Sequence, residues 1–435
     1  MQNLFSEFKP STAAEWKAQI IKDLKGETFE SLEWQNENDF TIKPFYTHED
    51  LAQAYQPAFT HADWDICVKT NETDSKLINL QLLNDLNRGA TSISVDCQNI
   101  NFEVALKNIQ LNYIAATFYI HPKDIEWLTN YLSKNYKLND LNITLFPKRL
   151  DTQKDLNYWQ SVISIFSSYK NIKAISVNNL YYHNQNCFSY YEVALIFSQL
   201  NEFLNNKAIT TTANIAIKTG VSTDYFIQIA KLRAIRRLWE ILKKEYELTN
   251  NLYIIVETSL TNKSISDSYN NLVRTSVESM AAIAGGCNEL IVNSFDTLFT
   301  QNKNLGARMA INQQLILKEE SYLNKMADVS CGSYYIESIT DAIAEKALQT
   351  FKQFEEQGGY FKCLENKLFE TEIAKQAQQK ADTINTQLQT VIGVNKYKNE
   401  SEKINLSTDI KTQLQQLAIN NPVLNFELQN TFNNA

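Results

Sequence analysis

The clearest indication of the fold is a strand–helix–strand pattern over residues 215–259, IAIKTGVSTDYFIQIAKLRAIRRLWEILKKEYELTNNLYIIVETS. The β-branched runs near its two ends predict buried strands over Ile215–Gly220 and Leu252–Thr258. The intervening DYFIQIAKLRAIRRLWEILKKEY predicts a long helix. This order is typical of two parallel strands joined by a right-handed helical crossover.

The same alternation extends outward from this unit over most of the chain. Together with those two strands, six more candidates make eight, and a helical pattern follows each of them. The six are Trp64–Lys69, Ser92–Cys97, Ala116–His121, Asn142–Pro147, Ile172–Asn178 and Glu289–Phe295. Eight strands with eight crossovers predict an α/β fold of the (β/α)₈ TIM-barrel type. A doubly wound open sheet is the main rival.

The segments that flank the barrel differ from it in pattern. We expect an N-terminal arm over 1–45, the barrel over 46–345, and a helical extension with a polar tail over 346–435. In the arm, Thr12 and Glu15 have capping-box spacing at the start of a helix. Five apolar side chains of the arm either pack on their own domain or bind a partner subunit: Phe5, Phe8, Trp16, Ile20 and Leu24.

Composition excludes several classes of function. The 435 residues carry 41 basic and 49 acidic side chains, a net charge of −8, which argues against a nucleic-acid partner. No run of about 18 apolar residues is present, so no membrane span is expected. The N-terminus MQNLFSEFKP lacks the pattern of a secretory signal. We therefore predict a cytoplasmic protein.

Three residue types are scarce or scattered. None of the 10 glycines forms G-x-G-x-x-G or the P-loop, so the two common phosphate cradles are absent. Histidine occurs four times and never after residue 183. The six cysteines form no C-x-x-C, and we expect reduced, mostly buried thiols rather than metal ligands or disulfides.

A few polar residues near strand ends are candidates for a site at the barrel mouth, where barrel enzymes keep their catalytic groups. His121 ends the third strand and can act as an acid or base, although a structural histidine is the plainer interpretation. His183 follows the fifth strand, where a hydrogen bond that orders the loop is expected. Lys218 and Glu257 lie near the ends of neighbouring strands and predict either a buried ion pair or two solvated charges.

Two charged groups elsewhere are weaker candidates. Asp63 and Asp65 suggest a paired-carboxylate site, but a solvated loop is the plainer interpretation. The basic KLRAIRR stretch (231–237) is expected to form an exposed or interfacial face of its helix rather than a phosphate site.

Several long stretches resemble the methylmalonyl-CoA mutase family. They are TDYFIQIAKLRAIRRLW (223–239), YNNLVRTSVESMAAIAGG (269–286), ARMAINQQLILKEESYLNKMADVSCGSYYIESITD (307–341) and VIGVNKY (391–397). LFSEFKPSTAAEWKAQIIKDLKG (4–26) and YYHNQNCFSYYEVA (181–194) resemble the small (β) subunit of the heterodimeric enzyme. The resemblance implies a (β/α)₈ barrel followed by a cobalamin domain, and interconversion of (R)-methylmalonyl-CoA and succinyl-CoA with adenosylcobalamin.

The features that this resemblance ties to catalysis are missing. The cobalamin motif Asp-x-His-x-x-Gly is absent, because no histidine follows His183. By the family's pattern the proton-donor histidine of the seventh strand falls at Ile255, and the arginine-rich run of the first strand is replaced by FTHADWDICVKT (59–70). We therefore expect no cobalamin domain, no catalytic residue and no cofactor or metal bound by this chain.

The strand sequences also predict a filled barrel axis, which would leave no channel for coenzyme A. In the third strand one register points Phe118 and Ile120 inward, and the other points Tyr119 and His121 inward. Either register puts an aromatic ring on the axis, and Leu145 or Phe146 adds bulk from the fourth strand.

The favoured hypothesis is thus a non-catalytic small subunit of an isomerase. It would pair with the large (α) subunit, which binds adenosylcobalamin, and would present a large apolar patch when isolated. Two alternatives stay open. One is a catalytic acyl-CoA mutase barrel whose cobalamin domain is a separate chain, and the other is a stand-alone barrel that binds another small ligand near Lys218 and Glu257.

Overall fold

The computed structural model describes residues 9, 11–36, 40–51, 55–148, 150–205, 213–298, 304–399, 408–418 and 421–432. The predicted Phe5 and Phe8 lie outside these residues.

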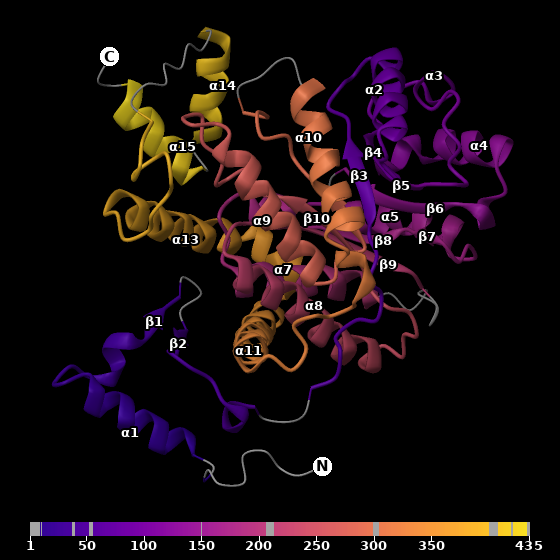
Figure 1. Ribbon diagram of the computed structural model, residues 1–435. Helices are drawn as coiled ribbons and strands as arrows, with labels where there is room; N and C mark the ends of the chain where they lie inside the picture. The colour runs from indigo at the N-terminus through magenta and orange to yellow at the C-terminus, as the bar shows by residue number, and fades with distance from the viewer. Residues whose placement is uncertain are drawn as a thin grey trace.

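A closed parallel barrel forms the centre of the described chain (Figure 1). Its strands are β3 (Asp65–Lys69), β4 (Ser92–Asp96), β5 (Ala115–Ile120), β6 (Asn142–Pro147), β7 (Ile172–Lys173), β8 (Ile175–Asn178), β9 (Ile215–Val221), β10 (Tyr253–Thr258) and β11 (Glu289–Ile291). The sheet order is β7-β6-β5-β4-β3-β11-β10-β9-β8. Because only Ala174 separates β7 from β8, these two segments are one broken strand and the sheet closes. The (β/α)₈ prediction is confirmed, and the open sheet is excluded.

Helices surround the barrel, each following a strand. They are α2 (Ser75–Asn87), α3 (Phe102–Ala105), α4 (Ile125–Asn135), α5 (Gln153–Phe166), α6 (Leu180–His183), α7 (Ser189–Leu204), α8 (Tyr225–Glu245), α9 (Asn270–Ala284) and α10 (Asn304–Leu315). Short turns η3 (Pro122–Asp124) and η4 (Leu138–Asp140) flank α4, and the π-turn η5 (Ile316–Glu320) extends α10.

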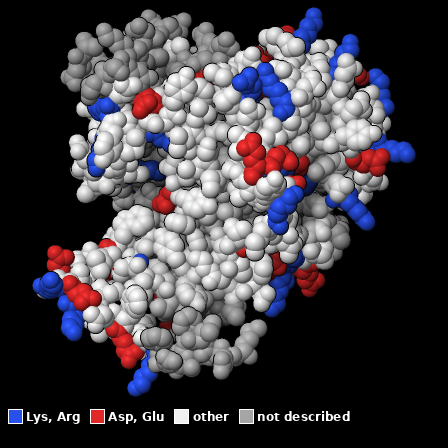
Figure 2. All heavy atoms as spheres, viewed as in Figure 1, with Lys and Arg blue, Asp and Glu red and all other residues white. Residues whose placement is uncertain are grey.

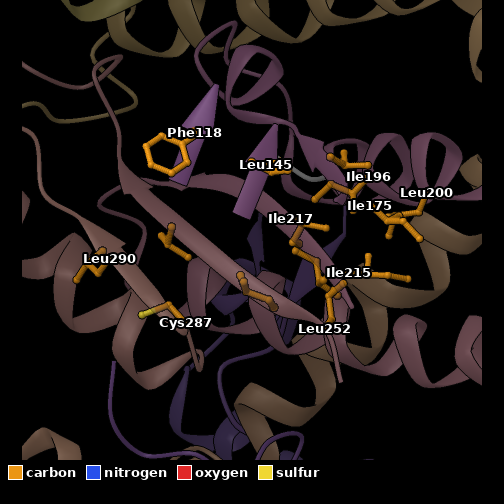
Figure 3. Packing of buried hydrophobic residues seen from close by; sticks show 14 of the residues in the cluster. Phe118, Leu145, Ile175, Ile196, Leu200, Ile215, Ile217, Leu252, Cys287 and Leu290 are labelled. Atoms are coloured by element: carbon orange, nitrogen blue, oxygen red, sulfur yellow. The ribbon is translucent and has the colours of Figure 1, made fainter. Parts of the chain in front are cut away.

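Strand alternation sorts side chains between the helices and the axis. The outward side chains are β-branched or aliphatic and pack against the helices, as Ile175 does beside Ile196 and Leu200 of α7 in Figure 3. Phe118 and Leu145 also belong to this outer core. The inward-facing residues of β5 and β6 are therefore Tyr119 and Phe146, which decides between the two registers left open by the sequence.

The basic stretch on α8 corrects the expectation of an exposed or interfacial face. Lys231 and Arg233 are fully buried, and Arg236 is nearly so. The reason is that α8 is covered on several sides, by α7, by α9 and by the later helix α11 (Tyr334–Glu356). Arg233 is paired with Asp328 and Glu337, so its charge is neutralised inside the fold.

The C-terminal extension is helical and packs on one side of the barrel (Figure 1). After the short turn η6 (Leu323–Lys325) come α11, α12 (Gly359–Glu365) and α13 (Leu368–Asn385), followed by α14 (Thr408–Ala418), α15 (Pro422–Glu427) and the π-turn η7 (Leu428–Phe432). Leu414 of α14 and Leu424 of α15 pack with Ile265 and Leu298, which lie in the loops after β10 and β11. The extension thus touches the end of the barrel where the strands finish.

The N-terminal arm projects from the body (Figure 1). It comprises α1 (Ala13–Asp23), η1 (Phe29–Leu32), the hairpin of β1 (Trp34–Gln35) and β2 (Thr41–Ile42), and η2 (His48–Asp50). The predicted capping box between Thr12 and Glu15 is present. None of the described residues of α1 is buried. Trp16 is 57% exposed, and Ile20 and Leu24 are half-buried.

Two further expectations concern cysteines and membranes. All six cysteines are free thiols, and five of them are buried, as predicted. Among the described residues, no helix combines the length and the apolar character that crossing a bilayer requires.

Candidate functional site

Side chains from four strands and the loop after β11 meet where the barrel strands end, and we call Lys69, Tyr119, Lys218, Glu257 and Asn293 the mouth cluster. Lys218 Nζ lies 2.8 Å from Glu257 Oε2 and donates to the Tyr119 hydroxyl at 2.7 Å. Lys69 pairs with the other carboxylate oxygen and donates to Asn293 Oδ1 at 3.1 Å. The buried ion pair that the sequence suggested between Lys218 and Glu257 is therefore present.

The opposite charges of the mouth cluster keep each other in the charged form. Burial alone would raise the pKa of Glu257, but the ammonium groups of Lys218 and Lys69 outweigh it and hold that pKa well below its usual range. Burial would likewise lower the pKa of Lys218, and Glu257 reverses this and raises it. Neither group can exchange a proton near neutral pH, so the pair is poorly suited to acid–base catalysis.

Apolar side chains fill the axis behind the mouth cluster. Cys67, Phe146, Ile255 and Ile291 form a buried group, and the ring of Tyr119 stacks on Phe146 with centroids 5.4 Å apart. Ile255 is fully buried on β10 between Lys218 of β9 and Glu289 of β11. The axis is packed with side chains, in agreement with the prediction.

A second polar group closes the opposite end of the axis. Tyr253 donates to Glu289 at 3.3 Å, and Lys173 Nζ lies 4.2 Å from the centre of the Tyr253 ring. Burial lowers the pKa of Lys173 to about 8, although Glu289 and Asp65 oppose that shift. Burial also raises the pKa of Glu289. One feature of the sequence indicates this group, because Lys173 and Glu289 are charged residues inside strands that are otherwise mostly apolar.

His183 belongs to a separate buried group behind the barrel wall. Its Nδ1 lies 3.2 Å from Glu192 Oε2, and Lys231 Nζ lies 3.0 Å from the same oxygen. Burial lowers the pKa of His183, which Glu192 opposes. The imidazole also fills the space beside Gly220, where an added Cβ would clash with His183 Cδ2. The predicted loop-ordering hydrogen bond of His183 is thus directed to Glu192 of α7.

The remaining candidates do not join the mouth cluster. His121 is exposed after β5, and its Nδ1 accepts a hydrogen bond from the Lys123 amide at 3.3 Å. Asp63 pairs with Lys318 at 2.7 Å, whereas Asp65 accepts from the Thr91 hydroxyl at 3.0 Å. The two aspartates therefore have separate partners, and no paired-carboxylate site forms between them.

Two hollows among the described residues lie near the barrel, and the smaller one touches the mouth cluster through Lys69 and Asn293. The larger, of about 1050 Å³, lies where β9 and β10 begin and is lined by Phe59, His61, Lys173, Arg236 and Tyr253 among others. A smaller one, of about 70 Å³, lies between β3 and α10. Neither of these hollows is lined by Lys218 or Glu257. Within the described residues, no group of three or more His, Cys, Asp or Glu side chains is arranged to hold a metal ion.

Sequence reasoning missed Lys69, Tyr119 and Asn293 as partners of the ion pair. A signal existed for Lys69, because Asp65, Cys67 and Lys69 alternate on one face of the first strand. No local signal pointed to Asn293, since it lies beyond the strand and reaches Glu257 across the mouth, with Nδ2 at 3.1 Å from Oε1. Chemically, the assembled cluster joins β3, β5, β9 and β10 and closes the mouth.

Comparison with known proteins places these observations in a family. The family model for methylmalonyl-CoA mutase matches residues 163–421. The methylmalonyl-CoA mutase small subunit of Porphyromonas gingivalis is 27% identical over 447 aligned positions, which cover 92% of this chain and 72% of that protein.

Mutases of other organisms match a shorter part of the chain. The mitochondrial methylmalonyl-CoA mutase of Homo sapiens is 35% identical over 188 residues, and the probable mitochondrial methylmalonyl-CoA mutase of Caenorhabditis elegans is 36% identical over 192 residues. Each alignment covers 42% of this chain but only 25% of the mutase. The part of this chain that aligns thus spans about a quarter of the length of each of these two relatives.

Proposed function

The chain belongs to the methylmalonyl-CoA mutase family, and on that premise we propose that it is a non-catalytic small subunit, which pairs with a catalytic large subunit and stabilises it. The heterodimer would interconvert (R)-methylmalonyl-CoA and succinyl-CoA, and its cytoplasmic location stays a prediction. The observation that carries the proposal is the packed barrel axis, together with the likeness to a protein named as a small subunit.

The packed axis supports a non-catalytic role for physical reasons. A substrate that threads the barrel would have to displace Phe146, Tyr119 and Ile255 from a buried cluster. It would also have to separate the ammonium group of Lys218 from Glu257, where both side chains are at most 3% exposed. Breaking a buried ion pair costs about 3–5 kcal/mol before any new contact forms.

The residues present do not fit adenosylcobalamin either. The buried polar groups at the ends of β9 and β10 already pair with one another. The loop after β10 is held by α15, because Glu427 accepts from the amides of Ile265 and Ser266 at 2.9 and 3.0 Å. We therefore assign the cofactor to the large subunit, where it would supply the radical rearrangement.

The arm supports the pairing part of the proposal. Because no described residue of α1 is buried, the helix gains little from its own body and exposes Trp16. The ring of Trp16 meets Phe45 edge-on, with centroids 6.0 Å apart, which keeps the arm folded while one face stays free. Exposed aromatic anchors of this kind are typical of protein–protein interfaces.

Co-expression with the large subunit tests the pairing. We expect a 1:1 complex by size-exclusion chromatography with light scattering, and weaker association when Trp16→Ala removes the exposed ring. As a control, Tyr113→Ala changes another aromatic side chain, 81% exposed in the loop between α3 and β5, and should leave the complex intact. Absence of a complex with the unchanged chain would refute the pairing.

Activity assays test the non-catalytic part. With adenosylcobalamin and methylmalonyl-CoA, we expect turnover by the complex and none by this chain alone. The split-enzyme alternative predicts turnover when only a cobalamin-binding chain is added. Turnover by that mixture would contradict the proposed role.

A further inference from the structure

Helix α9 presents an apolar face to solvent. Tyr269, Val273 and Met280 recur at helical spacing, and their exposed fractions are 67%, 64% and 37%. The opposite face of α9 is buried against the barrel. A helix of a folded barrel normally turns its polar side outward, so this exposed face requires an explanation.

The face continues beyond the N-terminal end of α9. Arg274 of α9 donates to the carbonyl of Ile392 at 2.6 Å, which fixes residues 391–397 beside the helix. Ile392 is 44% exposed and Tyr397 is 71% exposed. Two separate segments therefore contribute to one surface.

At its other end the face reaches α8 and α11. Ala281 of α9 packs in one cluster with Ile229 and Ile336, and Tyr335 lies at the edge of that cluster. Phe226 meets Tyr335 edge-on at 5.4 Å and is itself half-exposed. The connection from α10 to α11 passes this end of α9, because α9 lies between α8 and α10 and α11 packs on α8.

That connection adds more exposed apolar side chains. Met326 is 69% exposed and Val329 is 56% exposed, while Asp328 between them is anchored to Arg233. We call the whole surface the α9 face, and define it as Phe226, Tyr269, Val273, Met280, Met326, Val329, Ile392 and Tyr397.

The α9 face is uncharged at its centre and large enough for a stable interface. The ionisable side chains of α9 are Arg274, bound to Ile392, and Glu278, buried with Lys263 at 2.8 Å. Figure 2 shows the corresponding white area over α9, with charged side chains toward its edges. Eight such side chains, each about half-exposed, offer on the order of 800 Å², which is what one partner contributes to a standard interface.

Building on the small-subunit function proposed above, we propose that the α9 face is the docking surface for the barrel of the large subunit. The arm lies beside this face, because Tyr46 at its root meets Tyr335 edge-on at 5.5 Å. A partner that covers α9 would therefore also come within reach of α1, so that the body and the arm bind one occupant. The face lies in segments that resemble the family, 223–239, 269–286, 307–341 and 391–397, so a related barrel is the occupant to which we commit.

Val273→Glu tests the docking surface, because it places a charge at the centre of the α9 face on an exposed helical position. We expect affinity for the large subunit, measured by biolayer interferometry, to fall by at least about tenfold. The matched control is Leu80→Glu on α2, a position 67% exposed, where affinity should not change. Equal affinities of both variants and the unchanged chain would overturn the α9 face while leaving the small-subunit function standing. Failure of the unchanged chain to bind at all would instead refute that function.

Hydrogen exchange of the unchanged proteins gives a test that needs no variant. On mixing with the large subunit, we expect slower exchange over 269–280 and 391–397, and unchanged exchange over α2. Unaltered exchange of both α9-face segments in a complex that does form would overturn the docking surface. Light scattering of this chain alone distinguishes a second copy: a dimer that Val273→Glu dissociates would assign the face to self-association and overturn the committed occupant.

Discussion

Replacing Glu257 by glutamine should destabilise the protein strongly, because it leaves the ammonium group of Lys218 buried without a counter-charge. Lys218 is 3% exposed and its carboxylate partner 2%, so water cannot solvate the remaining charge. Loss of one partner from a buried ion pair costs about 3–5 kcal/mol. The hydroxyl of Tyr119 stays at 2.7 Å from Lys218 Nζ and retains one hydrogen bond. We therefore expect Glu257→Gln to lower the free energy of unfolding by about 3 kcal/mol, the lower end of that range.

A double-mutant cycle isolates the pair. Lys218→Met alone should cost less than Glu257→Gln, because Glu257 keeps Lys69 as a partner. The double variant Lys218→Met/Glu257→Gln should recover about 1–2 kcal/mol relative to Glu257→Gln, since the fully buried ammonium group of Lys218 is gone. The ammonium group of Lys69, which also loses its carboxylate, is 27% exposed and can be partly solvated. Urea unfolding followed by circular dichroism measures all three variants. Glu103→Gln is the control, because Glu103 pairs with Lys134 at the surface and should matter by less than about 0.5 kcal/mol.

The same pair has a definite pH dependence. The pKa of Glu257 in the folded chain is lowered, so its stabilisation is present above the ordinary glutamate pKa of about 4.3 and is lost as the pH falls below it. The difference between the unchanged protein and Glu257→Gln should therefore shrink below about pH 4. If Glu257→Gln lowered the free energy of unfolding at pH 7 by no more than Glu103→Gln does, the proposed role of the Lys218–Glu257 pair in stability would be refuted.

Three further predictions concern other buried groups. Burial lowers the pKa of Lys173 from 10.5 to about 8, so the free energy of unfolding should rise between pH 8 and 10.5. Lys173→Met should raise the free energy of unfolding at pH 7 by about 1–2 kcal/mol, because removing the buried charge outweighs the lost hydrogen bond to Asn142. An unchanged urea midpoint would contradict this. Burial raises the pKa of Glu427 to about 7, so docking of α15 should weaken as the pH rises from about 4.5 through 7, and Glu427→Gln should abolish this pH dependence. Hydrogen exchange of residues 421–428 at pH 5.5 and 8.5, corrected for the intrinsic exchange rate, measures the docking. Equal pH responses of the unchanged chain and the variant would count against the prediction. Gly220→Ala should cost about 1–3 kcal/mol, because the new methyl group meets His183. The cost should be smaller in a His183→Ser background, and equal costs in thermal or urea unfolding of both backgrounds would exclude this contact as the cause.

The local pattern of the chain is sufficient to predict the barrel. Each of the eight strands is a short β-branched or aromatic run followed by a helical pattern, and such local periodicity depends only on residues that are neighbours in the chain. The strand Asn142–Pro147 has the predicted bounds, Ile172–Asn178 has the predicted ends but is broken at Ala174, and the others differ by a few residues at their ends. The same local information predicted the capping box of α1, a filled axis and reduced cysteines.

Long-range packing specifies which side chains fill the axis and which charges are buried. Lys69 and Glu257 lie 188 residues apart, and the register that turns Tyr119 rather than Phe118 inward depends on pairing with β4 and β6. Likewise, the basic residues of α8 look like a solvent-exposed face until α11 packs over them and supplies Glu337. A charged side chain such as Arg233 is stable in the core because the fold that desolvates it also places opposite charges beside it. The desolvation and the opposite charges both depend on contacts between distant segments, which no local pattern records.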